Sequence, residues 1–221
     1  MLERFALWLF GNYSVLIIVI VFITIISILV FYARRLRISE IVVISSLSAV
    51  SVASRVLVFI PFFKPCTAII IISGSAFGPV IGGTVGMLTG LISNVMFGQG
   101  PWTPFQMFCW GSIGVIAGFL KIKKKWQAIV FGFFMTLVFY GGIMNFYSML
   151  TGGSVFNIYR YIAFVINGLP CDLIHSAATV IFLYFGWNPF MKRLMRMKTK
   201  YGILSGRAGP KKQDCGTRGE S

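Results

Sequence analysis

The chain has 221 residues, of which 57% are hydrophobic and 11% are charged, and its mean hydropathy is +0.85. Soluble domains contain about a quarter of charged residues, so this composition excludes a soluble protein and indicates an integral membrane protein. The net charge of +15 is concentrated in clusters that flank apolar segments, at Arg34–Arg37, Lys121–Lys125 and Lys192–Arg218. Because short loops rich in Lys and Arg stay on the cytoplasmic side, these clusters predict topology and contact with anionic lipid, and no nucleic-acid partner is expected.

The first apolar run, Tyr13–Tyr32, is long enough to cross a bilayer. We expect residues 1–38 to form an additional N-terminal transmembrane helix and a basic loop. The next run, Ser39–Ile60, predicts the first helix of a membrane core over residues 39–191, and Pro61 ends that helix.

The apolar stretch Thr67–Phe97 has an unusual length for one membrane span. As a single helix it would reach about 46 Å, which exceeds a hydrocarbon core of about 30 Å. One crossing here would also place the cluster Lys121–Lys125 outside. Pro is tolerated in the first turn of a helix and not in its interior, so Gly78-Pro79 predicts a break into two short helices, Cys66–Phe77 and Pro79–Phe97.

Three more apolar runs complete the core: Phe105–Leu120, Trp126–Leu150 and Tyr161–Trp187. The predicted fold is therefore an all-α integral membrane protein, a six-helix bundle plus the additional N-terminal helix. Both ends of the bundle are expected on the cytoplasmic side. Residues 192–221 predict a basic, disordered cytoplasmic tail.

Acidic side chains are scarce, and their scarcity excludes most catalytic chemistry. Of the five Asp and Glu residues, only Asp172 lies inside a predicted span. Paired catalytic carboxylates and multi-acid ion relays need more. One His and four widely spaced Cys suggest neither a zinc site nor a disulfide framework, and the Gly-x-x-x-x-Gly-Lys phosphate loop is missing from the sequence. We expect no enzymatic activity, no catalytic residues, no metal and no cofactor.

The outward-facing segment Gly98–Met107 is uncharged, rich in turn residues and aromatic. Its two Pro residues fix the backbone, while Trp102 and Gln106 offer a ring face and hydrogen bonds. Aromatic walls with a few amide groups suit an organic solute in a concave site. The candidate solute-binding residues are Trp102, Gln106, Trp110, Asn145, Tyr147 and Asn167. For Tyr147 the alternative is an interfacial aromatic belt without a ligand.

Arg55 and Asp172 are charged residues within predicted spans, where each charge costs roughly 2.5 to 3.5 kcal/mol. A buried ion pair between them would satisfy both, bridging the first and last core helices. Direct contact with a ligand is the alternative.

Two stripes of small residues predict close helix contacts. Ser45, Ala49 and Ala53 recur every four residues on the first core helix, where they fit either internal packing or docking of another subunit. The stripe Gly82–Gly86–Gly90 favours internal packing.

Together these features resemble the substrate-binding S component of an energy-coupling factor (ECF) vitamin importer. The resemblance covers about Ser39–Leu194 and includes the short second and third helices and Ala49-x-x-x-Ala53. It implies that a small-molecule vitamin is captured from outside, and that the small-residue helix face docks on a membrane coupling (T) subunit. Two separate cytoplasmic ATPases would then drive transport, in the cytoplasmic membrane of a prokaryote.

The segments Arg55–Pro65, Ser73–Pro79 and Gly98–Met107 resemble a subgroup that is associated with cobalamin-type solutes. The alternatives from other classes are a membrane scaffold or assembly subunit without a solute, and a stand-alone secondary transporter. The secondary transporter is disfavoured by the single intramembrane acid.

Overall fold

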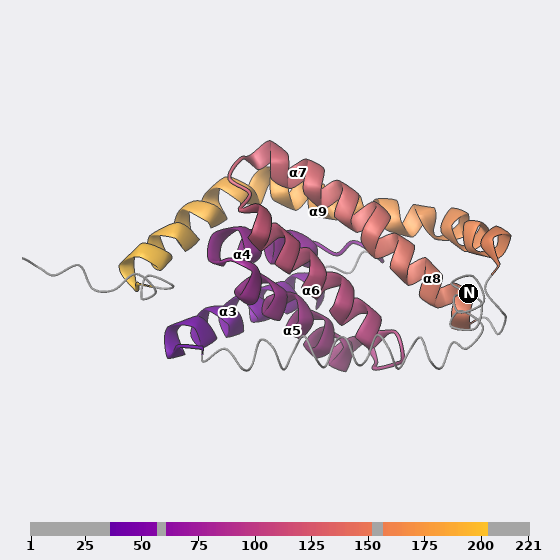
Figure 1. Ribbon diagram of the computed structural model, residues 1–221, viewed down its shortest axis with the longest axis horizontal. Helices are drawn as coiled ribbons and strands as arrows, with labels where there is room; N and C mark the ends of the chain where they lie inside the picture. Colours follow the sequence, from indigo (N-terminus) through magenta and orange to yellow (C-terminus); the bar gives the residue numbers. More distant parts are fainter. Residues whose placement is uncertain (1–35, 57–60, 152–156, 203–221) are drawn as a thin grey trace, which may run out of the picture.

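The computed structural model describes residues 36–56, 61–151 and 157–202. Every regular element in these ranges is helical: α3 (Ile38–Val56), α4 (Cys66–Phe77), α5 (Pro79–Phe97), α6 (Thr103–Leu120), α7 (Lys125–Phe134), η1 (Met135–Tyr140), α8 (Gly141–Thr151) and α9 (Ile158–Lys200). Helix α9 lies along α7 and α8, and α4 joins this layer to α3, α5 and α6 (Figure 1). The all-helical membrane fold is confirmed, and the expected helix at 13–32 lies outside the described residues.

Five helical stretches are long and apolar enough to cross a membrane, with α7, η1 and α8 forming one of them over Lys125–Thr151. The sixth core element, α4, has only 12 residues. Its length is tolerable because protein surrounds it, and 11 of its residues are buried. The six predicted core helices are thus all present, and α9 alone extends well beyond its expected end.

The chain breaks between α4 and α5 at Gly78, as predicted. Gly78 has a φ of +93°, a conformation that favours glycine, and its N–H donates to the Gly74 carbonyl at 2.7 Å. Pro79 then occupies the first position of α5, where no backbone donor is needed. The Gly78 carbonyl accepts from the Gly82 N–H at 3.0 Å, so Gly78 bonds to both helices.

Glycines bring α5 into backbone contact with α4 and α6. A Cβ atom on Gly82 would lie 2.4 Å from the Gly74 Cα, and one on Gly86 would lie 2.2 Å from the Trp110 carbonyl oxygen. On the facing helix, a Cβ on Gly114 would lie 2.1 Å from the Gly82 carbonyl oxygen. The Gly82–Gly86–Gly90 stripe is therefore internal packing, as expected.

A π-helical segment, η1, interrupts the otherwise α-helical stretch from Lys125 to Thr151. Hydroxyl groups compete for the backbone just before it: Thr136 Oγ1 donates to the carbonyls of Gly132 at 2.7 Å and Phe133 at 3.2 Å, and Ser176 of α9 also donates to Phe133, at 3.4 Å. Side-chain insertion of this kind widens the helical turn. The segment ends at Tyr140, deep in the bundle.

Helix α9 is longer than the predicted last span, because it continues through Pro170 and Pro189 to Lys200. Residues 192–200, expected as the start of a disordered tail, are helical, whereas residues 203–221 lie outside the described part of the chain. The extension contacts the rest of the molecule through the buried Leu194 and through Lys198, whose Nζ donates to the Ala76 carbonyl of α4 at 2.7 Å.

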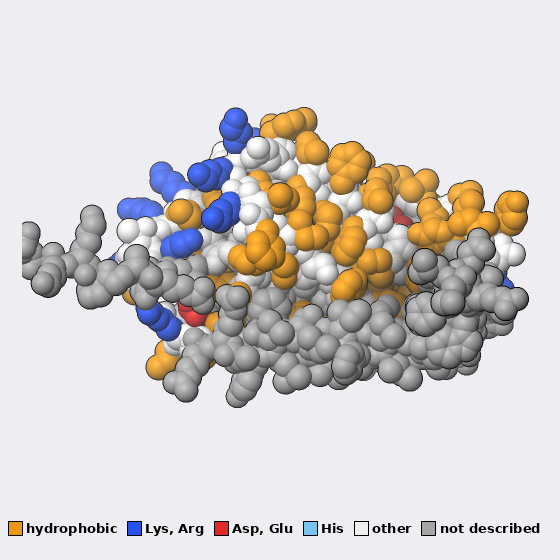
Figure 2. All heavy atoms as spheres, viewed as in Figure 1, with side chains coloured by type: hydrophobic (Ala, Val, Ile, Leu, Met, Phe, Trp, Pro, Cys, Tyr) orange, Lys and Arg blue, Asp and Glu red, His pale blue; other side chains and the backbone are white. Residues whose placement is uncertain are grey.

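Charge separates the two ends of the molecule. Lys and Arg side chains gather where α7 begins and α9 ends, while apolar side chains predominate over the other described residues of the visible face (Figure 2). This distribution matches the positive-inside prediction for the basic clusters. The 61–65 and 98–102 turns lie away from the basic end.

Candidate functional site

A hydrogen-bonded group around Arg55 lies between α3, α5 and α6. Arg55 Nη1 donates to Ser93 Oγ and, at 2.9 Å, to Asn94 Oδ1. Asn94 Nδ2 in turn donates to Thr103 Oγ1 at 2.9 Å and Gln106 Oε1 at 3.0 Å. All five residues are buried, so the charge of Arg55 is spread over amide and hydroxyl groups instead of water.

A second group surrounds Thr67 at the start of α4. Thr67 Oγ1 accepts a hydrogen bond from Trp110 Nε1 at 3.0 Å and lies 2.8 Å from His175 Nε2, to which it can donate. The Tyr140 ring stacks on Trp110 with centroids 5.3 Å apart and meets the His175 ring edge-on at 4.7 Å. The guanidinium of Arg55 lies 5.0 Å from the Trp110 ring centroid, which joins the two groups.

The third group is a carboxylate–amide pair between α8 and α9. Asn145 Nδ2 donates to Asp172 Oδ2 at 2.8 Å. Glycines make room for both side chains: a Cβ on Gly141 would lie 2.6 Å from Asp172 Oδ2, and one on Gly168 would lie 2.2 Å from Asn145 Oδ1. This pair leaves the second Asp172 oxygen for another donor.

The predicted ion pair between Arg55 and Asp172 does not form, because each residue has other partners within the described ranges. Helix α3 packs on α4 and α5, whereas α9 packs on α4, α7 and α8. The two charged side chains therefore belong to different hydrogen-bonded groups. Hydroxyl and amide groups pair with Arg55, and the Asn145 amide pairs with one oxygen of Asp172.

Lys64 lies in the turn that precedes α4 and was not among the predicted solute-binding residues. This turn places the Lys64 ammonium 5.6 Å from the Tyr140 ring centroid and 5.9 Å from the Phe62 ring centroid. Burial, with the nearby Arg55 charge as the next cause, lowers the pKa of Lys64 to about 8. A lone Lys beside Pro65 in a predicted loop carries no sequence signal for this role.

Residues 35–185 match the family described as ECF-type riboflavin transporter, S component. The chain belongs to this family. No curated protein and no solved structure matches the chain in the corresponding comparisons. Family membership makes the protein a substrate-binding subunit of a vitamin transporter and not an enzyme, and it gives no support to the cobalamin subgroup.

In this S component the six predicted solute-binding residues fall into separate environments. Gln106 and Trp110 are buried in the Arg55 and Thr67 groups, and Asn145 pairs with Asp172. Tyr147 packs on Phe105, with ring centroids 4.8 Å apart.

Trp102 and Asn167 lie apart from the polar groups of the S component. The half-buried Trp102 packs against the apolar cluster of Phe105 and Tyr147 and covers Gly100. Asn167 is exposed on α9. Successive helical residues lie about 100° apart, so Asn167 points away from α8 while the adjacent Gly168 faces Asn145.

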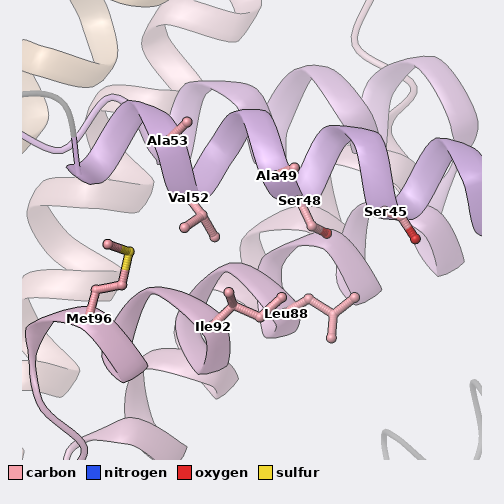
Figure 3. Close-up of a pocket in the computed structure, with 8 residues that line it drawn as sticks. All are labelled: Ser45, Ser48, Ala49, Val52, Ala53, Leu88, Ile92 and Met96. Carbon is pink, nitrogen blue, oxygen red and sulfur yellow. The ribbon is translucent and has the colours of Figure 1, made fainter.

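The small-residue stripe of the S component lines a groove between α3 and α5 (Figure 3). Ser45, Ala49 and Ala53 are all exposed, so the stripe is free of internal packing by described helices. The groove encloses about 510 Å³, and its other wall comprises Leu88, Ile92 and Met96. Its apolar, small-residue lining suits contact with another membrane helix.

Proposed function

We propose that this protein captures riboflavin from outside the cell and delivers it to an ECF-type importer. The observation that carries the proposal is the presence of three groups of hydrogen-bonding side chains among apolar helices, in a chain that belongs to the riboflavin-transporter S-component family. Polar groups are costly to bury in a membrane protein, so such a set supports ligand recognition.

The chemistry of the set suits a flat ring with carbonyl and N–H groups at one edge. The Asp172 carboxylate offers acceptors, the Asn145 amide offers one acceptor and one donor group, and the Lys64 ammonium adds a donor. Riboflavin has such an edge. Cobalamin, which the loop resemblance suggested, is the alternative solute, but the contact between Phe105 and Tyr147 holds α6 and α8 together and favours the smaller molecule.

A direct binding experiment tests the solute. The purified protein should quench riboflavin fluorescence with sub-micromolar affinity in the absence of ATP, and mass spectrometry of the untreated preparation should detect a retained flavin. Cobalamin, followed by its absorbance in a parallel titration, should bind far more weakly. Binding of cobalamin in preference to riboflavin would contradict the solute assignment, and binding of neither would favour a scaffold role.

We further propose that the groove between α3 and α5 receives a membrane coupling subunit that is driven by two cytoplasmic ATPases. Ala49 and Ala53 expose the backbone of α3 beside a helix-sized groove, which supports close approach of a second helix.

The double variant Ala49→Trp, Ala53→Trp should abolish co-purification of the coupling subunit and leave riboflavin binding unchanged. Ser46→Trp is the matched control, because Ser46 is exposed on α3 outside the groove lining. Retained docking in the double variant, or loss of docking in the control, would contradict the assignment of this face.

The proposed topology places the C-terminus in the cytoplasm of a prokaryotic cell. Pro101 and Lys123 are both exposed and lie in turns at opposite ends of α6, so each can be replaced by cysteine. A membrane-impermeant thiol reagent should label intact cells carrying Pro101→Cys and spare those carrying Lys123→Cys. The reverse pattern would exclude capture from outside.

A further inference from the structure

Two polar groups at the centre of the described helices have no hydrogen-bonding partner. The Tyr140 hydroxyl is buried and unpaired. The Lys64 ammonium contacts the rings of Phe62 and Tyr140, and no hydrogen bond or ion pair engages it within the described ranges. Both groups therefore retain hydrogen-bonding capacity, and the ammonium lies 5.6 Å from the centroid of the ring that carries the hydroxyl.

Leaving the Tyr140 hydroxyl unpaired costs stability, since a buried unsatisfied donor typically loses about 1 to 3 kcal/mol. The Tyr140 ring cannot turn outward, because Trp110 stacks on one side of it and His175 meets its edge. The π-helical segment η1 sets this position, and π-helical turns in α-helices are frequent at functional sites. The arrangement is costly for folding alone and useful if a ligand completes it.

The charges around the two groups favour a ligand that supplies acceptors. Arg55 and Lys64 contribute two positive charges, and Asp172, the acid that acts on Lys64, already accepts a hydrogen bond from Asn145. Two positive charges and one carboxylate therefore lie near the Lys64 turn. A carbonyl or carboxylate oxygen would correct that imbalance.

We propose that Tyr140 and Lys64 form a subsite that binds an acceptor oxygen of the transported solute. The Tyr140 hydroxyl and the Lys64 ammonium each donate to that oxygen, or to adjacent oxygens of one ring edge. This subsite rests on the proposed function, because it is a part of the same solute-binding site. In riboflavin, the ring carbonyls are the matching groups.

The subsite makes riboflavin affinity dependent on pH. Lys64 donates best as the ammonium, which is present below its pKa of about 8 in the free protein and is lost as the pH rises through that value. The groups that face it are Arg55 of α3, Cys66 of α4, Tyr140 of η1, and Cys171, Asp172 and His175 of α9. An acceptor oxygen on the solute stabilises the ammonium and raises the Lys64 pKa in the complex, so affinity falls above about pH 8.

Riboflavin titration of four variants tests the subsite. Tyr140→Phe should weaken binding by about 5-fold to 20-fold and Lys64→Met by about 10-fold to 100-fold, the scale of a lost neutral and a lost charged hydrogen bond. Tyr184→Phe and Lys125→Met are the matched controls, since these two residues pair with each other on α9 and α7 away from the network, and they should bind like the unchanged protein. Lys64→Arg should restore part of the affinity and, because guanidinium stays charged, remove the loss at high pH.

Thermal stability separates recognition from packing. Removing an unpaired buried hydroxyl should leave the melting temperature of Tyr140→Phe unchanged or raise it, so weaker binding without lower stability supports solute contact. Unchanged affinity in both Tyr140→Phe and Lys64→Met, with the unchanged protein still binding riboflavin, would overturn the subsite alone. If the unchanged protein binds no riboflavin, the proposed function fails and the subsite fails with it.

Discussion

Glycines face backbone in one region of this protein and side chains in another. Between α5 and α6, the atoms nearest to a Cβ on Gly86 or Gly114 are carbonyl groups of the facing helix, at 2.2 and 2.1 Å. Between the α7–α8 stretch and α9, a Cβ on Gly132 would meet Leu183 Cδ1 at 2.6 Å, and one on Gly141 would meet the Asp172 carboxylate.

This difference indicates which helix contact is rigid and which one has room for polar side chains. Two helices that touch through carbonyl oxygens and Cα atoms have a fixed distance, because no side chain can move aside. A glycine that faces a side chain creates space instead, and between α8 and α9 that space holds Asp172 and Asn145. The α4–α6 region therefore acts as a fixed wall, and the α8–α9 region carries polar groups that can adjust to a solute.

Gly114→Ala should be the most damaging change, with a loss of more than about 3 kcal/mol in the free energy of unfolding. The new methyl group would overlap the Gly82 carbonyl, so both helices must separate. The melting temperature in detergent measures the effect. Gly186→Ala is the control, because its nearest neighbours are ring atoms of Phe182 and Phe190 at 3.1 Å or more, and it should melt at or above the unchanged temperature.

Asn94→Leu should cost about 2 to 3 kcal/mol, since it removes an acceptor from the buried Arg55 and a donor from Gln106. Asp172→Asn should have a much smaller effect on unfolding, because Asp172 does not pair with Arg55. Urea unfolding of both variants measures this difference. An equal loss from Asp172→Asn would show that the two charges do interact.

Features that depend on a short stretch of chain were predictable from the sequence. The break between α4 and α5 could be predicted from Gly78-Pro79 alone, because the conformations of Gly and Pro are local properties. The Gly82–Gly86–Gly90 stripe likewise shows which face of α5 comes close to its neighbours. The ends of the helices before α9 followed from apolar length, whereas α9 continues past its apolar run to Lys200.

Features that depend on which helices meet were not predictable. The predicted Arg55–Asp172 pair was wrong because Arg55 bonds to α5 and Asp172 bonds to α8, and these partners cannot be predicted from spacing along the chain. Asn167 and Gly168 differ by one residue, but only Gly168 faces α8. Lys64 precedes the short helix α4 in a loop, and only the packing of α4 against its neighbours brings its ammonium close to the Tyr140 ring.

Thr67→Val should cost about 1 to 2 kcal/mol, because the Thr67 hydroxyl links the two regions compared above. It accepts from Trp110 of α6 and pairs with His175 of α9, so valine, which has a similar shape, leaves both rings without their partner. Urea unfolding again provides the measurement. Thr84→Val is the control, since the Thr84 hydroxyl donates only within its own helix, to Val80, and it should change stability by less than about 0.5 kcal/mol.

Gly141→Ala gives the smallest expected change in stability and the sharpest test of the comparison. Alanine favours a helix over glycine by about 1 kcal/mol, and the carboxylate of Asp172 can rotate away from the new methyl group. The gain in helix propensity and the cost of displacing the carboxylate oppose each other, so the melting temperature should shift little. The displaced carboxylate loses its hydrogen bond with Asn145, however, and riboflavin affinity should fall. A loss of stability as large as that of Gly114→Ala would mean that α8 and α9 are as rigidly fitted as α5 and α6, and that the polar groups between them cannot adjust to a solute.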